Sequence, residues 1–254
     1  MRYRIGFQTL VRREIVRFLS VFSQTLFPPL VSSFLFIFIF GYSLGAQIDR
    51  VGGVPYLEFL IPGLVMMTVI ESSYTNTSSS LFISRWANNI EELLVTPLSY
   101  VEMVLAILIG GLVRSFVIAA GVYGVSLFFV RFPVEHWLLV FYFYLFVSLT
   151  FSSVGMIVAL FAEEFEHLSI MTTFIITPLI YFGGVFNSVD MLPGFLRQWI
   201  PYNPIFYMIN GMRYGMLGTS DVPPAQAMVV VFLLFLSLFT TTVLLFKAGF
   251  KLRK

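Results

Sequence analysis

Long apolar runs alternate with short polar segments along most of the 254-residue chain. A helix needs roughly 20 mostly apolar residues to cross a bilayer. Five runs reach that length, and a sixth is slightly shorter but still long enough to cross. The pattern therefore predicts an all-α integral membrane protein with six transmembrane helices. The predicted spans are 25–46, 57–80, 101–130, 137–162, 168–186 and 226–247.

The composition agrees with a membrane protein. Hydrophobic residues make up 58% of the chain and charged residues 11%, whereas soluble domains are about 45–50% apolar and about 25% charged. The absence of cysteine excludes disulfides and thiolate metal sites, and no metal site is expected. The net charge of +2 is too small to indicate a nucleic-acid partner. Membrane lipid is the expected surrounding of most of the chain.

The basic residues are unevenly distributed, and their positions predict the orientation in the membrane. The first 17 residues hold five arginines, and all three lysines lie in the last eight residues. Lys and Arg next to spans are retained on the cytoplasmic side, so both termini are predicted to be cytoplasmic. The loops assigned to the outside hold four arginines: Arg50, Arg131, Arg197 and Arg213.

Residues 1–22 are predicted to form an N-terminal amphipathic helix at the membrane interface, ahead of a transmembrane domain at 23–254. Arginines on one side of the helical wheel suit anionic headgroups, although Arg4 and Glu14 interrupt the other, apolar side. The alternative is a positively charged flank without a surface helix. The apolar side comprises Tyr3, Phe7, Leu10, Val11, Ile15 and Phe18.

A second amphipathic helix, too short to span, is predicted at 84–97 between the second and third spans, and Pro97 ends it. An anionic inner leaflet would repel its adjacent Glu91 and Glu92. The sequence therefore favours docking of this helix on another protein. The residues that share its apolar face are Trp86, Ile90, Leu93 and Leu94.

The long outer segment at 187–225 is divided by five prolines. Asn203 and Pro204 form a good helix start, with a capping residue followed by proline in the first turn. The apolar run that follows has about 14 residues, which is too short to span. Two short re-entrant helices are therefore predicted at 189–217.

Two ionisable residues, Glu71 and Arg114, lie deep inside predicted spans, where each costs about 2.5–3.5 kcal/mol if unpaired. Their equal depth on consecutive antiparallel helices allows an intramembrane ion pair. A polar lining for a substrate or proton path is the alternative. In the fifth span, Gly183 and Gly184 predict either a helix that unwinds beside a path or a tightly packed kink.

Several catalytic motifs are missing. No lysine is available for a Gly-Lys-Ser/Thr phosphate-binding loop. The acidic loop at 163–167 contains His167, but the other histidine, His136, is predicted on the opposite membrane face, so no two-histidine metal site forms. An intramembrane hydrolase and an ion-coupled secondary transporter remain as alternatives, and no catalytic residue is predicted.

Several stretches occur together in one known family. They read Leu-Ile-Pro-Gly-Leu at 60–64, Asn-Asn-Ile-Glu-Glu-Leu-Leu at 88–94, Tyr-Phe-Gly-Gly-Val-Phe at 181–186 and Asn-Pro-Ile at 203–205. Over essentially its whole length, the chain resembles the membrane subunit of bacterial type-2 ABC exporters. These include permeases for nodulation factors, daunorubicin-like drugs and cell-surface polysaccharides.

The resemblance implies a transport permease, not an enzyme, in the bacterial inner membrane. It implies a homodimer whose two copies each bind a separate cytoplasmic ABC ATPase. ATP and Mg²⁺ would bind to that partner, and this chain would hold no cofactor. The exported cargo would be amphipathic, lipid-linked or of glycan type.

The resemblance also implies roles for particular residues. The 84–97 helix matches the family's coupling helix, which docks on the ATPase, and the path runs between two copies, lined chiefly by the first, second and fifth spans. The implied coupling residues are Arg85, Trp86, Asn88, Asn89, Ile90, Glu91, Glu92 and Leu93. The implied path residues are Phe38, Tyr42, Tyr181, Phe182, Gly183 and Gly184.

Overall fold

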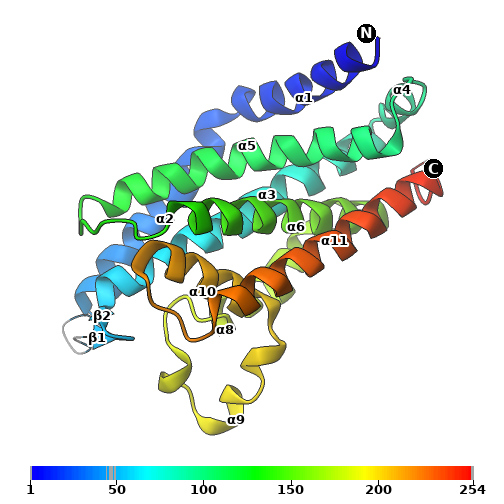
Figure 1. The fold of residues 1–254 in the computed structure, drawn as a ribbon. Helices are drawn as coiled ribbons and strands as arrows, with labels where there is room; N and C mark the ends of the chain where they lie inside the picture. The colour runs from blue at the N-terminus through cyan, green and yellow to red at the C-terminus, as the bar shows by residue number, and fades with distance from the viewer. Residues whose placement is uncertain (1, 44, 46–47, 49, 253–254) are drawn as a thin grey trace.

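The computed structural model describes residues 2–43, 45, 48 and 50–252, with the side chains of residues 2–4 and 42 outside the described part. Its long helices lie side by side, and both termini and α4 (Ile90–Leu94) lie at one end of this bundle (Figure 1). A two-stranded antiparallel hairpin, β1 (Arg50–Val51) and β2 (Val54–Pro55), lies at the other end. Apart from this hairpin, the all-α prediction is confirmed for the described residues.

Five helices are long and apolar enough to cross a membrane, and they match five of the predicted spans. The sixth predicted span, 168–186, falls on a shorter apolar helix, Glu166–Phe182. The count of six spans therefore stays a prediction. The five long helices are α2 (Phe22–Ser43), α3 (Tyr56–Trp86), α5 (Tyr100–Ser126), α6 (Trp137–Phe161) and α11 (Pro224–Lys247).

The shorter apolar helix has three parts: α7 (Glu166–Met171), the π-helical turn η1 (Thr172–Ile176) and α8 (Thr177–Phe182). Pro178 has no N–H to donate into the preceding turn, which accounts for the wider turn just before it. The helix ends at Gly183, and Gly184 has a φ of 90° that favours glycine. The helix ends before the glycine pair, and whether this segment lines a path stays a prediction.

The outer segment contains four short helices: η2 (Val189–Met191), α9 (Gly194–Arg197), η3 (Ile200–Tyr202) and α10 (Pro204–Leu217). Asn203 caps α10 as predicted, because its side chain accepts a hydrogen bond of 3.0 Å from the Ile205 N–H. Gly218, with a φ of 70°, ends α10. Whether these helices re-enter the membrane stays a prediction.

The central helix is α3, which packs against α5, α6 and α10. Gly111 on α5 and Gly155 on α6 let the backbones of α5 and α6 approach α3 closely at Thr77. A Cβ on Gly155 would lie 2.6 Å from the Tyr74 carbonyl oxygen and 3.1 Å from the Ser78 nitrogen of α3. The Thr77 hydroxyl donates a hydrogen bond of 2.9 Å to the Ser152 carbonyl of α6. Small and hydroxylated side chains therefore hold the centre of the bundle.

Replacing Gly155 with alanine is expected to reduce stability by about 1–3 kcal/mol, because the added methyl group meets a helix backbone that cannot turn away. Gly124→Ala on α5 is the matched control, since nothing lies within 4 Å of its added Cβ. That control is expected to leave stability unchanged or raise it by up to about 1 kcal/mol. Thermal unfolding in nanodiscs measures both, and equal melting temperatures would contradict the close packing.

Candidate functional site

The C-terminal end of α3 lies within the segment 84–97 that was predicted as one amphipathic helix. The prediction of a single helix there was wrong. Arg85 and Trp86 form the last turn of α3, and only the five residues of α4 are helical after the turn. Asn88 causes the break, because its φ of 59° lies in the left-handed region that cannot continue a helix. The segment is a tight helix–turn–helix corner.

The corner separates side chains that the prediction grouped together. Ile90 and Leu93 are buried in a cluster that also contains Leu10 of the N-terminal helix. Arg85 points inward, where its guanidinium donates hydrogen bonds to the Ala159 and Ala162 carbonyls at the end of α6. Ile90 and Leu93 are therefore unavailable for docking, and Arg85 holds the corner to α6.

The remaining predicted coupling residues are exposed. Trp86 is 68% exposed, and the two glutamates of α4 and both asparagines also face outward. The exposed residues are Trp86, Asn88, Asn89, Glu91 and Glu92. They form an acidic surface with one large aromatic side chain, at the end of the bundle that holds both termini (Figure 1).

A cavity of about 390 Å³ lies beside Trp86, between the end of α3 and the loop that joins α6 to α7. Lys251 Nζ of the C-terminal tail lies 3.8 Å from Glu163 Oε1. Within the part of the chain that the structure describes, no three His, Asp or Glu residues are grouped to hold a metal ion. The surface at this end of the bundle is thus acidic and hollowed. The cavity is lined by Phe82, Ile83, Trp86, Glu163, Glu164, Phe165 and Glu166.

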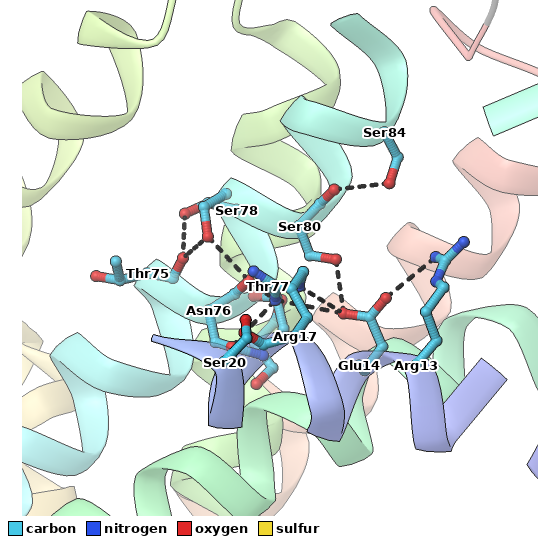
Figure 2. A network of polar contacts seen from close by, with 12 residues as sticks. Arg13, Glu14, Arg17, Ser20, Thr75, Asn76, Thr77, Ser78, Ser80 and Ser84 are labelled. Carbon is cyan, nitrogen blue, oxygen red and sulfur yellow. Dashed lines mark hydrogen bonds and ion pairs between the residues drawn. The ribbon is translucent and has the colours of Figure 1, made fainter. Parts of the chain in front are cut away.

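The N-terminal helix α1 (Arg2–Ser20) packs along α5 and is joined to α3 by a polar clasp of Glu14, Arg17, Asn76 and Ser80 (Figure 2). Glu14 is fully buried, lies 3.3 Å from Arg17 and accepts a hydrogen bond of 2.6 Å from Ser80. Arg17 donates to the Asn76 backbone and side-chain oxygens at 2.9 and 3.1 Å. Figure 2 shows these groups pointing toward one another from the two helices.

The clasp was missed by sequence reasoning, which treated Glu14 as an interruption of an apolar, lipid-facing side. Gly110 of α5 makes room for it, because a Cβ there would lie 2.7 Å from the Glu14 Cβ. Leu10 and Phe18 are buried on the same side of α1. The presence of a carboxylate within the apolar side of α1 was the available signal for a buried polar cluster, because a charged side chain is rarely buried without partners. Placement of α1 at the membrane interface stays a prediction.

The predicted path residues lie on α2 and at the end of α8. Phe38 stacks on Phe34 at a ring distance of 6.2 Å and is 51% exposed. Tyr181 and Phe182 are 41% and 49% exposed. The side chain of Tyr42 lies outside the described residues. Several predicted path residues thus keep accessible aromatic surface.

A buried arginine holds the glycine turn in place. Arg213 of α10 is 1% exposed and donates a hydrogen bond of 2.6 Å to the Gly184 carbonyl. Its guanidinium carbon lies 3.8 Å from the ring centre of Phe59 on α3, within the range of a cation–π contact. Sequence reasoning counted Arg213 only as an outer-loop charge. Its neighbours Gly211 and Gly215, which pack closely on α6, were the signal that this helix is buried.

Glu71 and Arg114 do not form the predicted ion pair: no ion pair joins them among the described residues. Equal depth sets the height of a side chain but not the direction in which it leaves the helix. Arg114 lies where Arg17 is a neighbouring charge, on the α1 side of the bundle. Glu71 makes no ion pair among the described residues, so the prediction of an intramembrane pair is corrected.

Comparisons with known proteins identify the family of the chain. The model of the ABC-2 type transporter family matches residues 5–217, and the chain belongs to this family. The chain is similar to the inner membrane transport permease YadH of Escherichia coli K12, with 40% identity over 221 residues, covering 87% of this chain and 86% of YadH. It is also similar to nodulation protein J of Rhizobium leguminosarum bv. trifolii, with 26% identity over 219 residues, covering 85% and 82%.

Membership of the family makes this chain a membrane permease of an ABC transporter, not an enzyme, and ATP is hydrolysed by a partner subunit. The apolar helices and the inner-membrane relative indicate a multi-pass protein of the inner membrane. The hydrolase and the ion-coupled transporter considered above are not favoured.

Proposed function

We propose that the chain is the membrane-spanning subunit of an exporter that moves an amphipathic, lipid-linked or glycan-type cargo outward across the bacterial inner membrane. Two copies bind two ATPase subunits, and both termini face the cytoplasm. The acidic corner at the end of α3 carries this proposal. Its apolar side chains are buried in the bundle while Trp86, Glu91 and Glu92 remain exposed, which is the pattern of a docking surface on a rigid support.

ATP and Mg²⁺ bind on the partner, and closure of the two ATPases pushes each corner. Arg85 joins the corner to the end of α6, and the Glu14–Arg17 clasp joins α1 to α3. A displacement of the corner therefore reaches α1, α3 and α6 together. The path opens between the two copies, where Phe38, Tyr181 and Phe182 offer aromatic surface to the cargo.

Opposite charge across an interface speeds and orients docking, whereas like charge costs several kcal/mol. The double variant Glu91→Lys, Glu92→Lys should therefore weaken binding of the partner ATPase at least roughly tenfold. Its melting temperature should stay that of the wild type, because both side chains are exposed. The measurement is co-purification of the tagged permease with the co-expressed ATPase, followed by ATP hydrolysis.

Glu135→Lys, an exposed substitution before α6 at the opposite end of the bundle, is the control and should bind the ATPase normally. Normal ATPase binding by the double variant would remove the corner from the proposed interface. Failure of the wild-type chain to form any complex with an ATPase would overturn the proposed function itself.

A further inference from the structure

Glu71 is the middle residue of α3, with fifteen residues on either side. Its side chain is partly exposed, and its carboxylate is not among the enclosed atoms of the described chain. Within that part of the chain it makes neither a hydrogen bond nor an ion pair. A carboxylate at the centre of a span is therefore mostly enclosed, keeps a small accessible surface, and has no ion-pair or hydrogen-bond partner among the described residues.

Glu71 begins a polar strip along α3. Thr75 and Ser79 follow at intervals of four residues, so they share its face of the helix, and neither is buried. In contrast, every residue of α3 from Phe59 to Ile70 is buried. Along the second half of α3, the first side chains that are not buried on this face are therefore a carboxylate and two hydroxyl groups.

Contacts on either side of the strip show which helices flank it. Tyr74 donates a hydrogen bond of 2.9 Å to the Leu168 carbonyl of α7, on one side of the strip. Asn76 accepts from Arg17 of α1, on the other side. The strip therefore lies between α1 and α7. The next α-helices along the chain, α2 and α8, carry the exposed aromatic residues Phe38, Tyr181 and Phe182.

Lipid is an unfavourable neighbour for this strip, because an unpaired carboxylate at mid-bilayer costs about 2.5–3.5 kcal/mol. The carboxylate is tolerated where the strip faces a polar space or a positively charged group. A neutral cargo such as a glycan can be bound by hydroxyl and aromatic groups alone. A negative charge at this depth adds selectivity for a cation.

We propose that Glu71 is the recognition residue of a cargo-binding site for amphiphiles that carry a positive charge, such as a protonated amine. The proposal rests on the function proposed above and specifies its cargo. Glu71 attracts the cation, Thr75 and Ser79 offer hydroxyl oxygens, and the aromatic rings of α2 and α8 contact the apolar part. In a two-fold symmetric pair, each copy brings one Glu71 to the shared path, which strengthens the negative potential.

Tetraphenylphosphonium and tetraphenylborate are suitable probes, because they have nearly the same size and shape but opposite charge. Equilibrium dialysis against the full-length chain in nanodiscs measures the binding of each, with protein-free nanodiscs subtracted. The wild type is expected to bind the cation more tightly than the anion. Glu71→Gln should weaken cation binding at least roughly fivefold, by loss of one charge attraction. Glu71→Asp should retain most of it.

Glu58→Gln is the matched control, since Glu58 lies in the first turn of the same helix and should leave cation binding unchanged. Glu71→Gln should melt at or above the wild-type temperature, because the unpartnered charge is removed. Wild-type cation affinity in Glu71→Gln, or an equal loss in Glu58→Gln, would overturn the proposal. The assay needs no ATPase, so its failure is separable from a failure of the wild-type chain to form a complex with its partner.

Discussion

Replacing Arg17 with alanine is expected to lower the free energy of unfolding by about 3 kcal/mol, because it leaves a buried carboxylate with too few partners. Glu14 is fully buried, and Arg17 provides both its ion pair and two hydrogen bonds to Asn76. The Arg13 side chain is 46% exposed, so it compensates only in part. Thermal unfolding of the purified chain in nanodiscs measures the loss.

The double variant Glu14→Gln, Arg17→Ala tests the reason for that loss. It should be more stable than Arg17→Ala alone, because the buried charge is removed together with its partner. Arg12→Ala is the control on the exposed side of α1 and should change stability by less than about 0.5 kcal/mol. If Arg17→Ala melts at the temperature of Arg12→Ala, the clasp does not hold α1 to α3.

Replacing Arg213 with alanine is expected to cost about 3 kcal/mol or more. The change leaves a cavity where a fully buried side chain was, and it leaves the Gly184 carbonyl without its donor. It also removes the contact with Phe59. The loss should be seen as a lower melting temperature and as faster proteolysis of the segment that contains α9.

Arg213→Met separates volume from charge. Methionine fills much of the same space and needs no counter-charge, so this variant should recover at least half of the stability lost in Arg213→Ala. Arg197→Ala, at an exposed ion pair with Asp190, is the control and should cost less than about 1 kcal/mol. Equal losses for the methionine and alanine variants would show that the contact with Gly184, and not the filled volume, stabilises the turn.

The positions of the long spans could be predicted because each depends on local composition. Apolar length defines α5, α6, α11 and the start of α3 within a few residues, and the Asn203-Pro204 start of α10 is a local capping signal. The break of the predicted 84–97 helix depends on a single left-handed residue, Asn88. Asparagine also occurs inside helices, so its presence did not predict that conformation.

The candidate site could be predicted only in part, because spacing along one helix does not determine what faces it. Glu91 and Glu92 are exposed as expected, whereas Ile90 and Leu93 are buried in a cluster that includes Leu10 of α1, which lies far away in sequence. Glu14 and Arg213 are partnered by residues 66 and 29 positions away. Such pairings depend on the tertiary arrangement, and neither helix period nor charge count contains that information.

The α3 helix remains continuous for 31 residues despite Pro62, a length of roughly 46 Å. Its close packing at Thr77, between Gly111 and Gly155, lies nearer the C-terminal end of the helix than the N-terminal end. A stiff helix held there behaves as a lever with a short arm that ends at Trp86 and a long arm that reaches Phe59. The arms differ roughly twofold in length, so a tilt that moves Trp86 displaces Phe59 about twice as far in the opposite direction.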